Sequence, residues 1–462
     1  MKVFERIVCD DLMVKCSHLI DPRQHGFLKD KSCSTQLMNF CDSLQLSLNS
    51  NIRSDVIYFD FAKAFDSVNH DLILKKLKSS YYVDGLLLSF ISNYLKGRNQ
   101  SVVIGGHISG QLPVLSGVPQ GSILGPTLFV LFLNDIVSVI SPDTNILMYA
   151  DDTKIWRQIL SDSDHTSLQI DIDNLMDWAV RNKMKFHPSK TKVLMVSKFK
   201  PPLIDILPCI QYCYNMGTNV LDYVSFHKDL GIIMNNTLNF TEHATSLYNR
   251  ANQKFGLLKR TCHFVKDENK RRVLYITLVR SIFEHCPMVW RPSANTIVNK
   301  LETIQKRAFK WIKSNQSISY SGNDLLYYSH CKQLNILPVK FRFDFHDLKF
   351  FHSVVYQYSC VELPPYIEYY SGRSRLRSSH LDEYCFVSKV VPRGNFTSTN
   401  RRGFYHSYFY RSHLMWNLLP KTLRQTPKPS VFKKGFQIFL WNELSILPDS
   451  DFSENDNNDS QD

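Results

Sequence analysis

The stretch ILMYADDTKIW, residues 146–156, places two adjacent carboxylates, Asp151 and Asp152, between two mostly apolar runs. This pattern predicts a β-hairpin whose tip carries acids in place of the usual Asn-Gly or Asp-Gly pair. Two carboxylates about 4 Å apart repel by roughly 4 kcal/mol at an effective dielectric of about 20. A divalent metal with oxygen ligands is one compensating partner, and a solvated polar turn is the simpler interpretation of such a pair taken alone.

A third acid, Asp60, lies in the apolar run VIYFDF, residues 56–61. An Asp inside a strand costs several kcal/mol unless it is paired, protonated or bound to metal. The next segment, residues 62–82, has the apolar spacing of a helix, and Asp66 is interpreted as its cap. Phe65 follows at the strand–helix junction, so we expect it to face the same cleft as Asp60.

A glycine-containing loop separates these two acidic regions. Residues 101–115 alternate as a hairpin around a Gly-Gly pair and lead into SGVPQGSILGPTLFVLFLNDI, residues 116–136. Its glycines allow close backbone approach to a ligand, and residues 128–136 predict a buried helix beneath the loop. Such loops are common, but this one lies between the two predicted acid-bearing strands.

The remaining segments are assigned more coarsely. Residues 1–48 are predicted to be mostly helical, with the spacing of Val3, Phe4, Ile7 and Val8 as one signal. A basic loop at residues 23–37 carries Lys29 and Lys31, with Ser32 or Ser34 as a helix N-cap. It suits phosphate binding and equally suits an ordinary loop. The later predictions are a helix at 167–180, a basic turn and strand at 183–198, a linker at 199–208, a last strand at 229–235, basic helices at 238–314 and an aromatic-rich region at 316–440.

Composition limits the class of protein. A chain of 462 residues with 44% hydrophobic and 21% charged residues is long and apolar enough for two or three globular domains. The formal charge of +13 and the pI near 9.1 indicate a polyanionic partner, either nucleic acid or an anionic membrane surface. Eleven cysteines, an odd number, indicate reduced thiols. Without a membrane-length apolar run or a signal peptide, we expect a soluble intracellular protein of the nucleus or cytoplasm.

Taken together, Asp60, Asp151 and Asp152 form a set of carboxylates able to converge and hold two Mg²⁺ ions for nucleotidyl transfer. The chain at this point resembles the reverse transcriptase of a non-LTR (LINE-type, jockey-like) retrotransposon. Matching blocks occur in the order that the family shows. They are fingers-like VFERIV (3–8) and QHGFLKDKS (24–32), palm-like YFDFAKAFDSVNH (58–70), SGVPQGSILGPTLFVLFLNDI (116–136), MYADDTKIW (148–156) and KFHPSKTKV (185–193), primer-grip-like DLGIIMN (229–235), thumb-like segments 278–290 and 301–312, and the C-terminal segment 411–440.

The resemblance implies an α+β right-hand polymerase with an antiparallel palm sheet and a helical thumb. The implied divisions are partial fingers (1–48), a palm with inserted fingers elements and a primer-grip hairpin (49–235), a helical thumb (236–315), a mostly helical C-terminal region (316–445) and a disordered acidic tail (446–462). Trp290 and Trp311 are interpreted as core residues rather than base-stacking platforms.

The resemblance also implies roles for individual residues. Asp60, Asp151 and Asp152 would bind two Mg²⁺ ions, with Mn²⁺ as a substitute. Phe65 would be the steric gate that excludes a ribose 2′-hydroxyl. Lys190, or else Lys192, would protonate the departing pyrophosphate.

Other implied roles concern substrate binding. Gln120 and Gly121 would touch the incoming nucleotide and the template, and Lys29 and Lys31 would contact triphosphate or template phosphates. The basic helices would grip the primer–template backbone. The expected partners are an RNA template, a DNA primer and dNTPs, with no membrane, and the sequence does not give the oligomeric state.

Two departures from the family pattern bear on activity. The chain starts just before VFERIV, where relatives usually have more fingers sequence, so it resembles a polymerase core cut from a larger reading frame, with an endonuclease supplied by another chain. Asp30 and Lys31 stand where relatives often carry Gly and Arg. The alternatives are a viral RNA-dependent RNA polymerase, which Phe65 argues against, and a truncated inactive relic that still binds nucleic acid.

Overall fold

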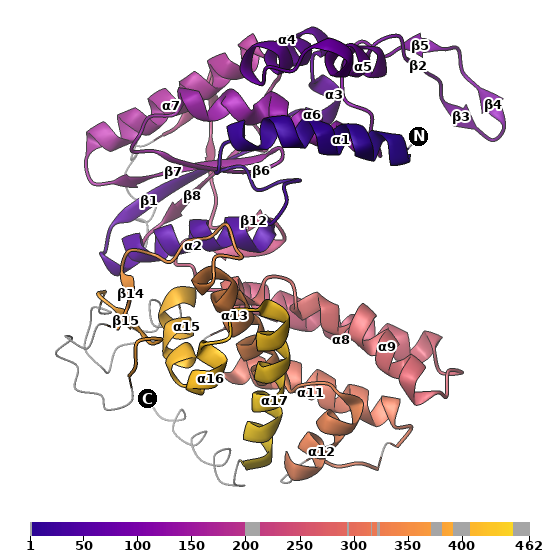
Figure 1. The fold of residues 1–462 in the computed structure, drawn as a ribbon, viewed down its shortest axis with the longest axis vertical. Helices are drawn as coiled ribbons and strands as arrows, with labels where there is room; N and C mark the ends of the chain where they lie inside the picture. Colours follow the sequence, from indigo (N-terminus) through magenta and orange to yellow (C-terminus); the bar gives the residue numbers. More distant parts are fainter. Residues whose placement is uncertain are drawn as a thin grey trace. The chain divides into compact units, whose positions relative to one another are not determined.

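In a computed structural model of the chain, the structure is described for residues 2–198, 213–292, 295–315, 317–320, 324–370, 381–390 and 407–446. The chain divides into two compact units, one of Met1–Leu230 with Asn235–Leu238 and the other of Gly231–Met234 with Asn239–Asp462. The predicted linker at 199–208 lies outside the described residues, as does the predicted acidic tail beyond residue 446. Figure 1 shows both helices and strands in the first unit and mainly helices in the second, so the expected mixed fold is confirmed.

The first unit is built on a five-stranded sheet in the order β11-β8-β1-β7-β6. Neighbouring strands are antiparallel except for the parallel β8–β11 pair. Strand β1 lies at the centre because its apolar run can be buried on both faces. The strands are β1 (Arg53–Phe59), β6 (Asn145–Tyr149), β7 (Asp152–Ile159), β8 (Lys192–Val196) and β11 (Asp222–Tyr223).

Alternation along β1 sorts its side chains between two helical layers. Ile57 and Phe59 belong to the large core shared with the helices on one face. Tyr58 points to the other face, where Phe40 of α2 (Cys33–Asn49) contacts it at a ring-centroid distance of 6.2 Å. Figure 1 shows α2 on the opposite side of the sheet from the helices that cover its other face. They are α1 (Lys2–Cys16), α4 (His70–Ser80), α6 (Leu124–Leu133) and α7 (Asp162–Arg181).

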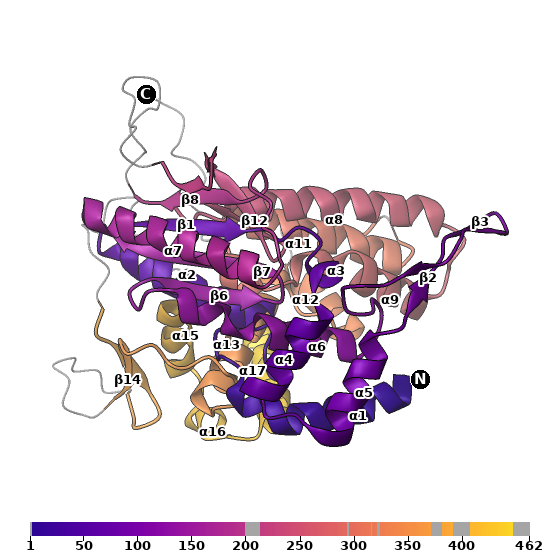
Figure 2. The same ribbon diagram turned by 90° about the horizontal axis from the view of Figure 1, so that it is seen from above.

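Smaller elements complete the first unit. The hairpin predicted around Gly105 and Gly106 is confirmed, and Figures 1 and 2 show it extending away from the sheet. The elements are η1 (Ser17–Leu19), α3 (Ala64–Ser67), α5 (Gly85–Leu95), β2 (Asn99–Gln100), β3 (Val103–Ile104), β4 (His107–Ile108), β5 (Leu112–Pro113), η2 (Asn134–Val139), β9 (Asn215–Met216), β10 (Asn219–Val220) and β12 (Phe226–Asp229).

The structure corrects the predicted surroundings of Asp60 and Asp66. Asp60 lies directly after β1 rather than inside it, so its carboxylate does not have to be buried in the strand ladder. Helix α4 is capped by Asn69, whose side chain accepts the N–H of Leu72, and not by Asp66, which lies in the short helix α3. The amide oxygen of Asn caps a helix as well as the carboxylate of Asp does, so Asn69 can serve as the cap that was predicted for Asp66.

Two further predictions are wrong in detail. Residues 229–235 are not one strand, because a turn at Leu230 and Gly231, with φ of 45° and 89°, separates β12 from β13 (Ile232–Asn235). This is also not the last strand, since β14 (Ile367–Tyr369) pairs with β15 (Phe386–Ser388).

The predicted helix at the start of the chain is confirmed, and α1 buries Val8 together with a charged residue. Val3, Phe4 and Ile7 are exposed, whereas the buried face carries Glu5, whose carboxylate accepts the backbone N–H of Ile123 at 2.7 Å. This polar contact turns the apolar residues of the first turn toward solvent. Ser32 caps α2 as predicted.

The second unit is mostly helical, as predicted for residues 238–314. Trp290 and Trp311 are buried, which confirms their interpretation as core residues. Its helices are α8 (Thr241–Thr261), α9 (Glu268–Leu278), η4 (Arg280–Phe283), α10 (Pro287–Trp290), α11 (Asn295–Ile312), α12 (Asp324–Leu334), α13 (Val339–Val355), α15 (Tyr408–Asn417), α16 (Lys421–Arg424) and α17 (Pro429–Ile446). Throughout the described residues, no helix combines the length and apolar character needed to cross a membrane.

Candidate active site

The register of the sheet brings the three acids to the same end of neighbouring strands. In the antiparallel β1–β7 pair, Phe59 lies opposite Thr153, so Asp60 and Asp152, one position further along, lie level with each other. In the β6–β7 hairpin, Tyr149 pairs with Asp152, which leaves Ala150 and Asp151 as the two-residue turn. The predicted hairpin is confirmed, with Asp151 at its tip and Asp152 as the first residue of the returning strand.

The pKa values report the crowding of negative charge. The pKa of Asp151 is raised, first by loss of solvent and then by the charge of Asp60. The pKa of Asp152 is raised to about 6, first by loss of solvent and then by Asp151, Asp229 and Asp60, with Lys154 acting in the opposite direction. The carboxylates therefore destabilise one another's charged forms, as the sequence predicted for a site that needs a compensating cation.

Asp60 is contacted by residues of the loop that precedes β8. The backbone N–H of His187 donates to the carbonyl of Asp60 at 2.7 Å, and Lys190 Nζ lies 3.3 Å from Asp60 Oδ2. Lys192, the alternative proton donor, instead pairs with Asp222 at 2.7 Å. The geometry therefore places Lys190, and not Lys192, beside the acids.

The donor set fits a magnesium ion that is completed by other ligands. Within the described residues, no three His, Cys, Asp or Glu side chains lie close enough to form a complete metal site. Mg²⁺ commonly takes one or two carboxylates and fills its remaining positions with water and substrate phosphates. Asp60 Oδ2 is shielded from solvent and accepts no hydrogen bond, and the Lys190 ammonium 3.3 Å away is its ion-pair partner, so a bound cation would share or replace this contact.

A cavity of about 180 Å³ extends behind the acids. Asp60, Asp152 and Lys190 form part of its wall, and the remainder comes from Tyr58, Phe59, Thr153, Lys154, His227, Lys228, Asp229 and Leu230. Lys154 and Asp229 form a buried ion pair inside it. The ring of His227 stacks on Tyr58 at 3.8 Å between centroids, and burial lowers the pKa of His227 to about 4.

Sequence reasoning missed this buried pair, although one signal was present. Lys154 follows Asp152 by two residues in a strand and is followed by the apolar residues Ile155 and Trp156. A lysine buried in a strand requires an acidic partner. The sequence therefore indicates that Lys154 needs an acidic partner, but only the folded structure identifies that partner as Asp229.

The segment that contains QHGF braces the acid-bearing turn. The N–H of His25 donates to the carbonyl of Met148 at 2.8 Å, and the N–H of Met148 donates to the carbonyl of Arg23 at 3.0 Å. The side-chain oxygen of Gln24 accepts the N–H of Ala150 at 2.9 Å. Ala150 has φ of 57°, a left-handed conformation unfavourable for alanine, so this contact stabilises the residue directly before Asp151.

The predicted gate and nucleotide loop lie together. Phe65 stacks on Phe129 of α6 at 4.3 Å, and its carbonyl accepts the N–H of Val118 at 2.9 Å. A Cβ on Gly117 would lie 2.9 Å from the Asp66 backbone, so this close approach requires glycine.

The two residues predicted to touch the nucleotide and template follow in the same loop. Gln120 Nε2 donates to Asp66 Oδ1 at 2.9 Å, which fastens the loop to the segment that carries Phe65. Gly121 has φ of 77° and open space around its α-carbon.

The two lysines predicted to contact phosphates, Lys29 and Lys31, form no hydrogen bond or ion pair with the three acids in the described part of the chain, and Lys31 contacts its own loop instead. Lys31 Nζ donates to the carbonyls of Pro22 and Gln24 at 2.6 and 2.8 Å, so it closes the loop in which it lies. Lys29 is exposed on the same loop.

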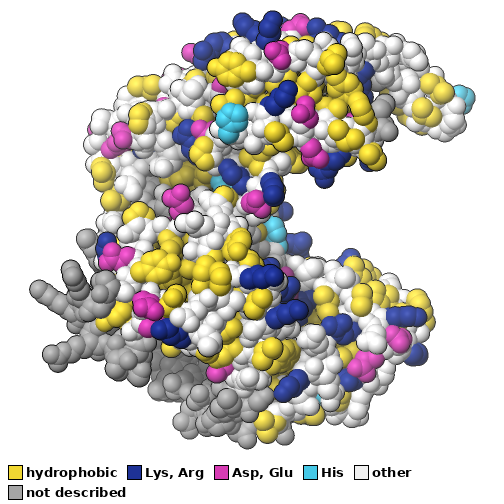
Figure 3. Space-filling model, viewed as in Figure 1, with side chains coloured by type: hydrophobic (Ala, Val, Ile, Leu, Met, Phe, Trp, Pro, Cys, Tyr) yellow, Lys and Arg dark blue, Asp and Glu magenta, His cyan; other side chains and the backbone are white. Residues whose placement is uncertain are grey.

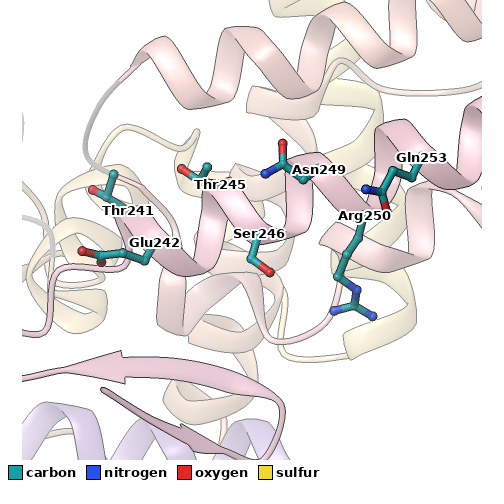
Figure 4. A pocket seen from close by; sticks show the side chains of 7 residues that line it. All are labelled: Thr241, Glu242, Thr245, Ser246, Asn249, Arg250 and Gln253. Atoms are coloured by element: carbon teal, nitrogen blue, oxygen red, sulfur yellow. The ribbon is translucent and has the colours of Figure 1, made fainter. Parts of the chain in front are cut away.

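The second unit offers a separate polar and basic surface. Figure 3 shows Lys and Arg side chains gathered over its helices on the face in view. An open groove of about 440 Å³ runs along α8, and Figure 4 shows the seven side chains that line it: Thr241, Glu242, Thr245, Ser246, Asn249, Arg250 and Gln253. Other basic residues predicted to contact nucleic acid are structural instead, since Arg271 and Arg280 are buried.

Comparison with known proteins adds to this geometry. The family described as reverse transcriptase (RNA-dependent DNA polymerase) matches residues 1–239, just over half of the chain. The RNA-directed DNA polymerase from mobile element jockey of Drosophila funebris is 25% identical over 325 residues, covering 67% of this chain and 34% of that protein. The probable RNA-directed DNA polymerase from transposon BS of Drosophila melanogaster is 26% identical over 331 residues, covering 67% and 35%. The chain thus spans about a third of the length of these relatives.

Among solved structures, apo telomerase from Candida tropicalis aligns with 71% of this chain and 54% of its own. The identity is 11% and the TM-score is 0.40.

Proposed function

The chain belongs to the reverse transcriptase (RNA-dependent DNA polymerase) family, and from this we propose that it is the polymerase part of a retrotransposon protein. It extends the 3′-hydroxyl of a DNA primer with dNTPs on an RNA template. The expected resemblance to the polymerases of mobile elements is confirmed by the relatives. The observation that carries the proposed activity is the strand register that sets Asp60 level with Asp152, with Asp151 in the adjoining turn.

In the proposed mechanism, Asp60, Asp151 and Asp152 hold two Mg²⁺ ions, for which Mn²⁺ can substitute. When bound, the ions stabilise the negative charge that develops on the attacking and leaving oxygens. The carboxylates supply this site only in their charged forms, so protons compete with the cations, and the elevated pKa values of Asp151 and Asp152 extend this competition to higher pH.

The other residues position substrate and protons. Lys190 Nζ, exposed beside Asp60, donates a proton to the departing pyrophosphate. Phe65 selects deoxynucleotides, since its ring overlaps the position of a 2′-hydroxyl. Gln120 and Gly121, on the loop fastened to Asp66, line the nucleotide and template path.

The polymerase regions follow from this assignment. We place partial fingers at 1–48, the palm at 49–235, the thumb at 236–315 and a further region at 316–445. The change from sheet to helices near residues 231–239 supports a palm–thumb boundary there. The phosphate backbone of the primer–template binds the exposed cations and polar side chains of the thumb, including Arg250, Lys254 and Lys270.

Primer extension tests the proposal directly. The purified chain, a DNA primer annealed to an RNA template, dNTPs and Mg²⁺ are expected to give extended product. Asp151→Asn is expected to lower extension at least about a hundredfold, because metal-assisted charge stabilisation is worth several kcal/mol. Asp143→Asn is the matched control, since Asp143 has an 82% exposed side chain and lies outside the site.

Binding measurements separate catalysis from nucleic-acid recognition. Affinity for the primer–template is expected to fall steeply with salt, as counterion release requires. Salt-sensitive binding without extension would reject the polymerase and leave a nucleic-acid-binding relic.

A further inference from the structure

Phe27 adopts an unusual conformation for a bulky residue. Its φ is 57°, in the left-handed region where the Cβ of an L-residue is crowded, and its side chain is 53% exposed. A large apolar side chain on the surface gains little from burial that could offset such a conformation. Local strain of this kind persists where surrounding contacts hold it, and it points to a role in function.

The contacts that hold Phe27 are those that brace the acidic turn. Gly26 N donates to the Gln24 side-chain oxygen at 2.7 Å, and the same oxygen accepts from Ala150 N. A Cβ on Gly26 would lie only 2.2 Å from Ala150 N, so the chain packs directly on the turn. The direction in which residue 27 leaves this contact is therefore fixed.

The ring of Phe27 is directed onto Phe65. Their ring centroids are 6.1 Å apart and the ring planes are nearly perpendicular, at 87°. Phe65 also stacks on Phe129, at 4.3 Å and 16°. Phe129 is fully buried, Phe65 half-buried and Phe27 exposed, so the three rings run from the core to the surface.

We propose that Phe27 is a specificity-determining residue that holds the ring of Phe65 in the orientation that excludes ribonucleotides. This inference rests on the proposed function, in which Phe65 is the steric gate. A gate rejects a 2′-hydroxyl by overlap, so its discrimination falls if the ring can rotate or shift away. Phe129 supports Phe65 from the core, and Phe27 restricts it from the solvent side.

Phe27→Gly removes the ring and preserves the backbone conformation, because glycine adopts the left-handed region readily. The variant therefore tests the ring alone. The full chain is assayed for kcat/KM with a dNTP and with the matching rNTP on one primer–template in Mg²⁺. We expect the dNTP/rNTP ratio to fall about two- to tenfold, the range that one aromatic pair contact provides. Phe27→Tyr, which retains the ring, is expected to keep the ratio.

Tyr82→Gly is the matched control. Tyr82 is also an exposed aromatic residue with positive φ, 54°, but it lies between α4 and α5. Its replacement is expected to leave the ratio unchanged.

Phe65→Ala distinguishes failure of this inference from failure of the gate. If Phe65→Ala relaxes selectivity and Phe27→Gly does not, the role of Phe27 is refuted and the gate stands. If Phe27→Gly lowers dNTP and rNTP use equally, its role is structural only, which also overturns the inference. If Phe65→Ala leaves the ratio unchanged, both the gate and the role of Phe27 are rejected. In the double variant, no loss beyond that of Phe65→Ala is expected, because the two rings act through one contact.

Discussion

Gln24 and Ala150 are joined by a buried hydrogen bond of 2.9 Å between the side-chain oxygen of Gln24 and the backbone N–H of Ala150. The residues are 126 positions apart, and Gln24 is 1% exposed. With the backbone hydrogen bonds between His25 and Met148 and between Met148 and Arg23, this contact ties the QHGF segment to the turn that presents Asp151.

Gln24→Ala is expected to lower the free energy of unfolding by about 1–3 kcal/mol, because it leaves the buried N–H of Ala150 without an acceptor. It is also expected to lower primer extension beyond what the unfolded fraction explains, since Asp151 follows Ala150. Urea unfolding and extension assays at matched folded fraction measure the two effects. Gln100→Ala, at an exposed position, is the control. An equal effect of both variants would contradict a bracing role for Gln24.

This contact marks the limit of what the sequence could predict. Local apolar spacing identified β1 and the β6–β7 hairpin, and therefore the three acids, because periodicity reports which face of a strand is buried. The partners of Gln24 and Lys154 are set by proximity in the folded chain, at separations of 126 and 75 residues. No local pattern encodes such a pairing, so these supports of the site were missed.

Errors near the ends of elements have a similar origin. Asp60 was predicted inside β1 and Asp66 at a helix cap, whereas Asn69 provides that cap. Several polar residues in one short segment can each end a strand or cap a helix, and tertiary contacts select among them. The burial of Glu5 on α1 also depends on a distant partner, the backbone N–H of Ile123, 118 residues away.

The buried Lys154–Asp229 pair gives a second prediction. Their side chains are 2% and 5% exposed, so Lys154→Met leaves a buried carboxylate unpaired and is expected to cost about 3–5 kcal/mol of unfolding free energy. The double variant Lys154→Met with Asp229→Leu is expected to be more stable than either single variant, because it removes both charges. Chemical unfolding of wild type, the two single variants and the double variant measures the coupling free energy between Lys154 and Asp229. Additive losses of unfolding free energy would contradict a direct pair.

A third prediction concerns the second unit, where Asp347 is fully buried between two arginines. Arg291 Nη1 and Arg411 Nε donate to Asp347 Oδ2 at 2.8 and 2.9 Å, and these cations keep the pKa of Asp347 lowered despite its burial. Asp347→Asn is expected to destabilise this unit by about 3–5 kcal/mol, because it removes the buried carboxylate charge that Arg411 contacts, whereas Arg291 keeps its second carboxylate, Asp344, at 2.7 Å. Thermal unfolding followed by near-UV circular dichroism detects the loss.

The control for Asp347 is an exposed ion pair in the same unit. Lys389 Nζ lies 2.6 Å from Glu368 Oε2, and the side chains of Glu368 and Lys389 are 49% and 58% exposed. Glu368→Gln is therefore expected to lower the free energy of unfolding by at most about 1 kcal/mol. A comparable loss in the two variants would mean that burial does not decide the contribution of Asp347.

The elevated pKa of Asp152 gives a prediction about pH. Its pKa is about 6 in the folded chain, against an ordinary value of 3.8. Between these values the folded chain holds a proton that the unfolded chain lacks, so this group's contribution to stability declines as pH rises from about 4 to about 6.5. The buried histidines His25 and His227, with pKa values lowered to about 3 and 4, act in the opposite direction and favour the folded state as pH rises.

A difference between variants isolates the carboxylate from these histidines. In EDTA, the stability gain of Asp152→Asn over wild type is expected to grow as pH rises from about 4 to about 6.5, because asparagine carries no charge to be crowded by Asp151 and Asp60. Mg²⁺ should reverse this trend for wild type alone, since the metal binds the charged carboxylate and competes with the proton. In the extension assay, the rise of activity near pH 6 should therefore move to lower pH as Mg²⁺ increases. An activity profile independent of Mg²⁺ concentration, or a stability difference independent of pH, would show that Asp152 does not couple proton and metal binding at this site.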